Sequence, residues 1–423
     1  MSNKTTVAVI GATIWGNRGA EAMLVTSIGQ VREMHPDTQF VIFSYLPKRD
    51  RSLINDKAIR VYDARPLALV LKYFPAAMLC WLFALIRIRL PDFVLPKAIR
   101  DLRQSDMLLD ISGISFADKR IKFLPFNILN IWPAFLLRVP VVKLAQAVGP
   151  FNNPLNRWCS RLFLARCHHI YARGKATAAH LTQLGLAQAK WTLAPDIAFL
   201  YKPEYSLSDE NDDLVNQLLE ELTALRSKDR MIIGLVPSSL VYQQMGKLGR
   251  DYVLQFLKLI RDLDTDYHYV VLPNATREGS TKTRNNDLAV IDLLEMRAER
   301  ELPAEAIQRL HFVNYDINTA SSRKIIEDCD LIVTSRFHGM ISGLCLRVPV
   351  VVIGWSHKYK EILDEFDMGH LALDFANPEL DASQLAYDAI ENRLQLGKQI
   401  TDNLPSVRTA AEQQFVNLQS LLH

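Results

Sequence analysis

The chain has 423 residues, more than one hydrophobic core normally supports, so we expect two domains of about 100–200 residues plus additional segments. Hydrophobic residues make up 49% and charged residues 22%, which is the composition of a globular protein and excludes a disordered one. The 49 basic and 46 acidic residues give a net charge of +3, which excludes the strongly basic footprint of a nucleic-acid-binding protein.

The five cysteines give no sign of disulfides or of a zinc site. Their number is odd, they are scattered, and no Cys-x-x-Cys or Cys/His spacing suited to zinc occurs. Such cysteines are typical of reduced core residues in a cytosolic protein. The chain also enters an apolar strand at residues 7–10, which leaves no room for a signal peptide. We therefore expect a cytoplasmic protein whose core contains Cys80, Cys159, Cys167, Cys329 and Cys345.

A glycine-containing loop, residues 11–19, separates the first predicted strand from a helix at residues 21–34. Proteins of the α/β class often bind phosphate or sugar at this place, although the spacing matches neither G-x-G-x-x-G nor Walker A. Asn17 and Glu21 could hold sugar hydroxyls there. A turn with positive φ angles explains the glycines equally well, and an acid is favourable in a first helical turn whatever its function.

Residues 66–90 form an apolar segment in which Lys72 is the single charge before Arg87. A membrane-spanning helix needs about 20 uninterrupted apolar residues, and Lys72 and Pro75 make this segment a poor candidate. Two alternatives remain. The segment is either a buried core helix or a helix lying on a bilayer, with Lys72, Arg87 and Arg89 reaching the headgroups. The position of Lys72 favours the second alternative.

Apolar strands alternate with helical segments along both halves of the chain. This alternation predicts parallel sheets covered on both faces, and hence an α/β protein with two Rossmann-like domains facing across a cleft. The polar stretch 202–213 predicts the boundary between domains at 1–205 and 206–380, and a helical segment, 381–423, is expected to pack back on the first. The strands are expected at 7–10, 39–43, 107–110, 141–145, 169–172, 231–236, 269–272, 310–312, 331–333 and 350–353.

Arg336 and His338 follow the apolar strand 331–333 and begin the next helix. Open α/β sheets bind ligands at this carboxyl edge, where a helix start also attracts anions. A fixed cation beside a titratable imidazole suits a small anion on which a proton is moved. The alternative is structural, with Arg336 paired to a local carboxylate and His338 serving as a packing residue.

Several motifs in order along the chain resemble the polysaccharide pyruvyl transferases. This family transfers a pyruvyl group from phosphoenolpyruvate to a sugar as a ketal, and the resemblance implies a GT-B-like architecture. The sequence shows no carboxylate cluster or Cys/His set suited to a bound cation, so we expect no metal and no cofactor beyond the donor substrate. The resemblance covers most of the chain from Val7 to Met368. The motifs are Gly16-Asn-Arg-Gly19-Ala-Glu21-Ala, Asp106 to Gly113, Gln146-Ala-Val-Gly149-Pro150, Arg173, Pro195-Asp196, Ser335-Arg336-Phe-His338, Val348-Pro-Val-Val and Lys358.

The resemblance implies roles for these residues. His338 would move protons, Arg336 would hold an anion, and Lys358 would add a second charge unless it is a solvated loop lysine. The family often has an arginine where this chain has Ser238. Either Arg173, Arg277 or Lys358 compensates for it, or this member handles the donor differently. The expected site residues are His338 and Arg336 for catalysis and Lys358, Arg173, Ser238, Asn17, Gly19 and Glu21 for substrate binding.

The sequence thus predicts a pyruvyl transferase acting on a cell-surface or exopolysaccharide precursor. The donor phosphoenolpyruvate is expected in the second domain and a saccharide or lipid-linked oligosaccharide acceptor in the first. The protein would be cytoplasmic, at the inner face of the cytoplasmic membrane, with peripheral membrane contact and no nucleic acid. The alternatives are a GT-B glycosyltransferase using a nucleotide sugar, and a non-catalytic glycan-binding paralogue.

Overall fold

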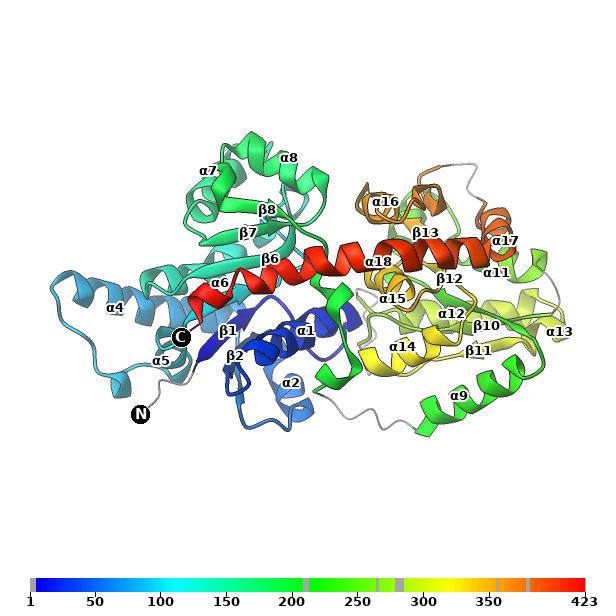
Figure 1. Cartoon of the computed structure of the whole chain (residues 1–423), viewed down its shortest axis with the longest axis horizontal. Helices are drawn as coiled ribbons and strands as arrows, with labels where there is room; N and C mark the ends of the chain where they lie inside the picture. The colour runs from blue at the N-terminus through cyan, green and yellow to red at the C-terminus, as the bar shows by residue number, and fades with distance from the viewer. Residues whose placement is uncertain are drawn as a thin grey trace. The chain divides into compact units, whose positions relative to one another are not determined.

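The chain folds into two compact units (Figure 1). The computed structural model describes residues 5–207, 213–263, 266–277, 285–354, 357–377 and 381–422. Unit 1 contains Met1–Trp15, Ala20–Ser208 and Arg408–His423, and unit 2 contains Gly16–Gly19 and Asp209–Val407. The predicted boundary stretch, 202–213, includes residues 208–212, which lie outside the described residues.

Unit 1 is built on a parallel sheet. Its strands lie in the order β3-β2-β1-β4-β6-β7-β8, with the short β5 paired to β6. All five strands predicted in this half are present; β3, β5 and β8 were missed because they are short or alternate buried with exposed residues at an edge. The bounds are β1 Thr6–Ile10, β2 Gln39–Ser44, β3 Ile59–Asp63, β4 Met107–Asp110, β5 Ile114–Ser115, β6 Val141–Val148, β7 His169–Ala172 and β8 Trp191–Leu193.

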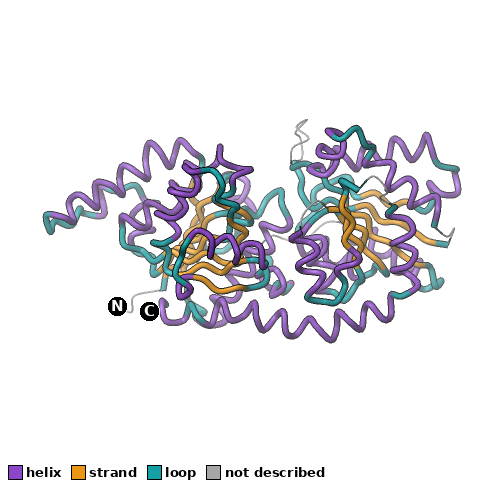
Figure 2. The backbone as a smooth tube through the Cα atoms, turned by 90° about the horizontal axis from the view of Figure 1, so that it is seen from above, coloured by secondary structure: helices purple, strands orange, loops and turns teal. Residues whose placement is uncertain are grey.

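Helices cover the sheet of unit 1, as Figure 2 shows. Local signals set several of their ends: Asn153 caps α7 by accepting hydrogen bonds from the backbone N–H groups of Leu155 and Asn156, and Pro154 fills its first position. The helices are α1 Arg18–Met34, α2 Pro47–Leu53, α3 Pro66–Ala68, α4 Phe74–Leu85, α5 Lys97–Arg103, α6 Leu124–Leu136, α7 Pro154–Leu164 and α8 Lys175–Leu184.

Unit 2 is built on a second parallel sheet, in the order β11-β10-β9-β12-β13-β14. Numbered within the unit, this is third, second, first, fourth, fifth, sixth, which is the doubly wound order of dinucleotide-binding folds. All five strands predicted here are present, and the short edge strand β14 was missed. The bounds are β9 Met231–Val236, β10 Tyr267–Val271, β11 Leu310–Phe312, β12 Leu331–Thr334, β13 Val350–Gly354 and β14 Ala372–Asp374.

The helices of unit 2 alternate with its strands. Its central strands β12 and β13 are completely buried, which explains their continuous Val and Ile runs. The last helix, α18, continues into the part of the chain assigned to unit 1, where Gln414 donates to the carbonyl of Pro195. The bounds are α9 Asp213–Arg226, α10 Ser239–Lys247, α11 Tyr252–Asp262, α12 Leu288–Glu301, α13 Ala304–Ile307, α14 Thr319–Glu327, α15 Phe337–Cys345, α16 His357–Asp364, α17 Ala382–Glu391 and α18 Arg393–Val416.

The apolar segment of unit 1 is one helical rod in which a π-helical turn, η1 (Leu69–Tyr73), joins α3 to α4. One side of the rod is buried in the core of unit 1 through Leu69, Tyr73, Ala77 and Cys80. The prediction of a buried core helix therefore holds for this side only, because the opposite side of the rod is exposed. Among the described residues, the rod Pro66–Leu85 is the one helix that is long and apolar enough to cross a membrane, and about a third of its 18-residue apolar window is buried (33%).

Candidate active site

The central candidate is the carboxyl edge of the unit 2 sheet, between β9 and β12. The strand order reverses there, and open α/β folds bind ligands at such a point. The segment Gly16–Gly19 also belongs to this edge. Arg18 N donates to the carbonyl of Asn274 at 2.9 Å, and Asn17 forms an antiparallel bridge with Ala275. The last four residues of the predicted glycine-containing loop, Gly16–Gly19, thus lie against the loop that follows β10.

Arg336 is the N-cap residue of α15. Its backbone N–H donates to Thr334 Oγ1 at 3.0 Å, which fixes the turn out of β12. Its guanidinium forms an ion pair with Asp287 and donates from Nη2 to Ser239 Oγ at 3.2 Å. The local carboxylate that the structural alternative requires beside Arg336 is therefore present, and it is that of Asp287. Arg336 Nε is nevertheless buried without a hydrogen-bond partner among the described residues, and a buried donor of this kind marks a place for an acceptor.

Asp287 organises this edge from a completely buried position. Its carboxylate accepts hydrogen bonds from the backbone N–H groups of Ser239 at 2.9 Å, Ala275 at 2.8 Å and Asn274 at 3.2 Å, in addition to the pair with Arg336. One side chain thus links the loops after β9, β10 and β12. Sequence reasoning missed Asp287. The signal that it offers, an acid directly before α12, predicts only a helix cap.

His338 packs directly on the backbone of Gly19. A Cβ atom built on Gly19 would overlap the imidazole ring at Nδ1, so a residue without a side chain is required at that position. On its other side the ring meets Phe337 edge to face, with the ring centroids 5.3 Å apart. Gly19, predicted to bind substrate, therefore provides the surface that positions His338.

Substituting Gly19 by alanine is expected to lower turnover by about 10²-fold, because the new methyl group displaces His338, and a misplacement of about 1 Å in a catalytic group costs that much. The matched control is Gly246→Ala, since a Cβ there has no neighbour within 4 Å. Steady-state kinetics of both variants, with melting curves to show that they are folded, checks this. Wild-type turnover in Gly19→Ala would show that the position of His338 does not matter.

Two further arginines lie at this edge. Arg18 is buried, 3.6 Å from Asp316, and Arg277 donates to the carbonyl of Gly16 at 2.6 Å. Burial lowers the pKa of Arg277; the charge of Asp316 opposes this effect, and the positive charges of Arg18 and Arg336 reinforce it. Arginine stays protonated in proteins, so Arg18, Arg277 and Arg336 bring three positive charges to this edge, against the two negative charges of Asp287 and Asp316. Sequence reasoning considered Arg277 only as a compensating residue and missed Arg18.

Ser238 lies at the edge but is buried. Its hydroxyl caps α10 by accepting from the N–H of Val241 at 3.4 Å, and its own N–H donates to the hydroxyl of Tyr252 at 3.0 Å. Tyr252 in turn donates to Ser335 Oγ at 2.7 Å. Burial raises the pKa of Tyr252, so the phenol remains a neutral donor. Ser238 thus connects the turns after β9 and β12.

Lys358 is half-buried in the first turn of α16. Its ammonium lies 5.0 Å from the ring centroid of Phe337 and 5.2 Å from that of Tyr359, which is cation–π geometry. These rings place its charge beside the start of α15. Trp355 and Ser356, in the motif that precedes Lys358, lie outside the described residues.

The family model for polysaccharide pyruvyl transferase matches residues 17–357, which include the whole edge described above. The chain belongs to the polysaccharide pyruvyl transferase family. The resemblance of its motifs to this family is thereby confirmed, and so is its assignment as an enzyme of polysaccharide biosynthesis.

Solved structures similar to this pyruvyl transferase family member share its GT-B fold. They include the UDP-GlcNAc 2-epimerase of Neisseria meningitidis bound to UDP-GlcNAc, at 12% identity and a TM-score of 0.58 over 98% of both chains. S. aureus MnaA with UDP has 13% identity and a TM-score of 0.57, over 98% of this chain and 95% of that one. Anabaena Alr3699/HepE, in complex with UDP and glucose, has 11% identity and a TM-score of 0.55, over 98% of this chain and 97% of that one. The predicted α/β fold of two Rossmann-like domains is confirmed.

The remaining predicted site residues of this family member lie in unit 1. Arg173 forms a buried ion pair with Asp196 and donates to the carbonyl of Gly113 at 2.6 Å. Asp196 also caps the turn after it by accepting from the N–H of Ala198. Glu21 lies in the first turn of α1 with its side chain buried. Neither Arg173 nor Glu21 is part of the arginine-lined edge in unit 2.

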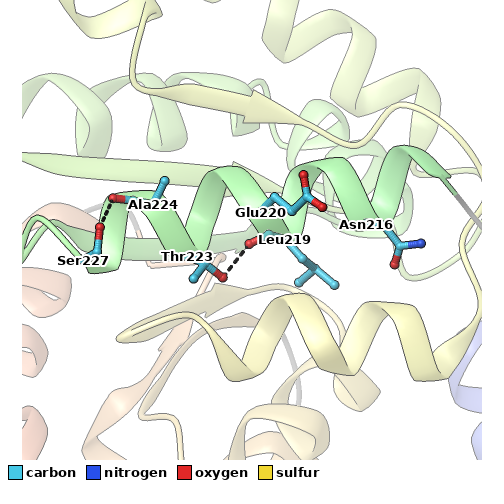
Figure 3. A pocket seen from close by; sticks show the side chains of 6 residues that line it. All are labelled: Asn216, Leu219, Glu220, Thr223, Ala224 and Ser227. Atoms are coloured by element: carbon cyan, nitrogen blue, oxygen red, sulfur yellow. Dashed lines mark hydrogen bonds between the residues drawn. The ribbon is translucent and has the colours of Figure 1, made fainter.

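A separate surface hollow runs along α9 of the pyruvyl transferase family member (Figure 3). None of the predicted site residues lines it. Its hydroxyl groups are used within the helix, because Thr223 donates to the carbonyl of Leu219 and Ser227 to that of Ala224, both at 2.8 Å. The hollow lies on one surface helix, away from the carboxyl edge of the sheet, and we do not take it as the candidate active site.

Proposed function

We propose that this protein transfers the pyruvyl group of phosphoenolpyruvate to a pair of sugar hydroxyls in a cell-surface or exopolysaccharide precursor, forming a ketal. The observation that carries the proposal is the placement of Arg336 and His338 at the start of α15, beside Arg18 and Arg277. Phosphoenolpyruvate carries two anionic groups, a phosphate and a carboxylate. Guanidinium groups and a helix start are the donors that such groups prefer.

The reaction requires a proton on the methylene carbon of the donor and the removal of protons from two sugar hydroxyls. Two C–O bonds form at the central carbon, and the C–O bond to phosphate breaks. One hydroxyl proton is retained in the new methyl group, and the other leaves with phosphate. His338 transfers protons in this scheme, Arg336 and Arg277 hold the anionic groups, and Lys358 adds a positive charge from α16.

The acceptor in this proposal is a saccharide or a lipid-linked oligosaccharide bound on the side of unit 1. Asn17, which lies just before α1 in the segment assigned to unit 2, would contact its hydroxyl groups, whereas the side chain of Glu21 is buried. The proposed location is the cytoplasm, at the inner face of the cytoplasmic membrane. In support, all five cysteines are free and buried, as expected for a protein in a reducing compartment.

A nucleotide-sugar transferase is the second candidate, because similar structures contain UDP, UDP-GlcNAc or UDP with glucose. A thermal-shift panel of phosphoenolpyruvate, UDP-sugars and GDP-sugars separates the two. A ligand at 100 times its Kd stabilises the protein by about 2.7 kcal/mol. We expect a shift with phosphoenolpyruvate. A shift with a nucleotide sugar alone would contradict the proposal, and the absence of any shift would favour a non-catalytic glycan-binding paralogue.

Activity is expected to survive EDTA. In this proposal guanidinium and ammonium groups hold the phosphate that leaves, and no cluster of three or more His, Cys, Asp or Glu side chains suited to a cation occurs among the described residues. The measurement is phosphate release with and without chelator, followed by addition of magnesium. Complete loss in EDTA that magnesium restores would contradict this account and favour a nucleotide-sugar donor.

A further inference from the structure

The outer side of the helical rod in unit 1 is apolar and exposed. We name six side chains the apolar ridge: Leu67, Leu71, Leu82, Leu85, Ile86 and Phe93. Five of them follow one side of the rod at helical spacing, and Phe93 lies in the turn after it. Their exposed fractions run from 47% for Leu82 to 84% for Phe93. A helix that is apolar on all sides is normally covered on all sides, so the apolar ridge calls for a partner.

The rod is accessible to a large partner. Figures 1 and 2 both show α4 and the loop after it extending beyond the sheet of unit 1. The inner side of the rod stays fixed in the core, because Leu69 and Ala77 are almost completely buried there. A position across a bilayer would require that packing to break, whereas a position on its surface leaves the packing intact.

The charges around the apolar ridge are mainly positive, and the two acids that flank it in the sequence, Asp63 and Asp92, form ion pairs with Arg65 and Arg103. No acidic residue occurs from Ala64 to Pro91, whereas Arg65, Lys72, Arg87 and Arg89 do, all exposed. Unit 1 as a whole has 27 basic and 14 acidic residues, which give a net charge of +13. Unit 2 has 22 basic and 32 acidic residues, which give a net charge of −10. The overall charge of +3 hides this asymmetry.

We propose that the apolar ridge inserts into the interface of a bilayer that contains anionic phospholipids. Lys72, Arg87 and Arg89 have long side chains that reach the headgroup phosphates while the aliphatic and aromatic side chains enter the acyl boundary. A second copy of the chain is a poorer partner, because it would bring two units of charge +13 together. This inference does not depend on the pyruvyl donor or acceptor.

Vesicle sedimentation of the full chain tests the proposal. We expect binding to vesicles containing about one quarter phosphatidylglycerol at about 50 mM salt, and much weaker binding to pure phosphatidylcholine or at about 500 mM salt, where the Debye length is short. Absence of binding to the anionic vesicles at low salt overturns the proposal. Concentration-dependent dimerisation that the ridge substitutions abolish, without vesicle binding, also overturns it in favour of a second copy.

Variants locate the binding surface. Leu82→Gln with Ile86→Gln is expected to weaken vesicle binding at least about tenfold without lowering the melting temperature, because both side chains are already exposed. The matched control, Leu248→Gln with Leu394→Gln, removes exposed apolar side chains from unit 2 and should leave binding unchanged. An equal loss of vesicle binding in both double variants would overturn the proposal.

Charge variants test the electrostatic part. Replacing Lys72, Arg87 and Arg89 by glutamine should weaken binding to anionic vesicles by about 10²-fold, which is about fivefold for each charge. Binding that is unchanged in this triple variant would overturn the role of the anionic lipid. Turnover with a water-soluble saccharide acceptor is expected to stay at the wild-type level in all ridge variants. A failure of the membrane proposal can therefore be distinguished from a failure of the proposed pyruvyl transfer.

Discussion

Replacing His338 by alanine is expected to lower turnover by about 10² to 10⁴-fold while phosphoenolpyruvate binding stays close to that of the wild type. A general acid or base acts mainly in the transition state, so its loss appears in kcat rather than in the donor Kd. In the proposed mechanism Arg336 and Arg277, not the imidazole, hold the anionic groups of the donor. Single-turnover kinetics and donor titration by calorimetry measure the two quantities separately.

His311→Ala is a suitable control for His338→Ala, because it removes an imidazole of unit 2 from β11, at the far edge of the same sheet. This control should keep wild-type turnover. Unchanged turnover in His338→Ala would assign the imidazole to packing, the structural alternative. Loss of donor binding in parallel with turnover would instead make His338 a binding residue.

Substituting Asp287 by alanine is expected to destabilise the protein by about 3–5 kcal/mol. The substitution leaves the guanidinium of Arg336 without its counter-ion and removes the acceptor of three backbone N–H groups. Urea unfolding followed by fluorescence or circular dichroism measures the loss. Asp402→Ala, at an exposed position of α18, is the matched control and should change stability by less than about 0.5 kcal/mol.

The double variant Asp287→Ala with Arg336→Met separates the buried charge from the lost hydrogen bonds. If an unpaired cation causes most of the destabilisation, removing both partners should cost less than removing Asp287 alone. A double variant as unstable as the sum of the two single variants would show that the ion pair contributes little. The backbone hydrogen bonds of Asp287 would then be the main source of stability at this edge.

The fold was predictable because parallel strands buried on both faces are continuous apolar runs. Val350–Gly354 reads Val-Val-Val-Ile-Gly and was found at nearly its observed bounds. The missed strands are those whose patterns are weak. In β3, exposed Arg60 separates buried Ile59 and Val61, and in β8 only Trp191 is buried. The apolar rod was ambiguous because its inner and outer sides are both largely apolar, and only the structure tells them apart.

The site was predictable only where a motif lies at a strand end. Arg336 and His338 follow β12 directly, so the sheet topology places them at the carboxyl edge. Asp287 precedes α12 and Arg18 begins α1, so both reach the same edge from positions far away in the sequence, and no local pattern predicts such contacts. Arg173, for which the resemblance implies substrate binding, forms an ion pair with Asp196 in unit 1, and its binding role stays a prediction.

The assignment of Gly16–Gly19 to unit 2 has a consequence for how the protein is made on the ribosome. Arg18 forms hydrogen bonds with Ile317 and Thr319, about 300 positions later, and the backbone of Gly19 packs against the ring of His338. At about 5–20 residues per second, these partners emerge roughly 15 to 60 s after the N-terminal segment. During synthesis from the N-terminus, the segment between the first strand and the first helix therefore lacks its packing and hydrogen-bond partners until unit 2 has been made. For the same reason, a chimera that exchanges only residues 209–407 would pair the new unit with a foreign loop.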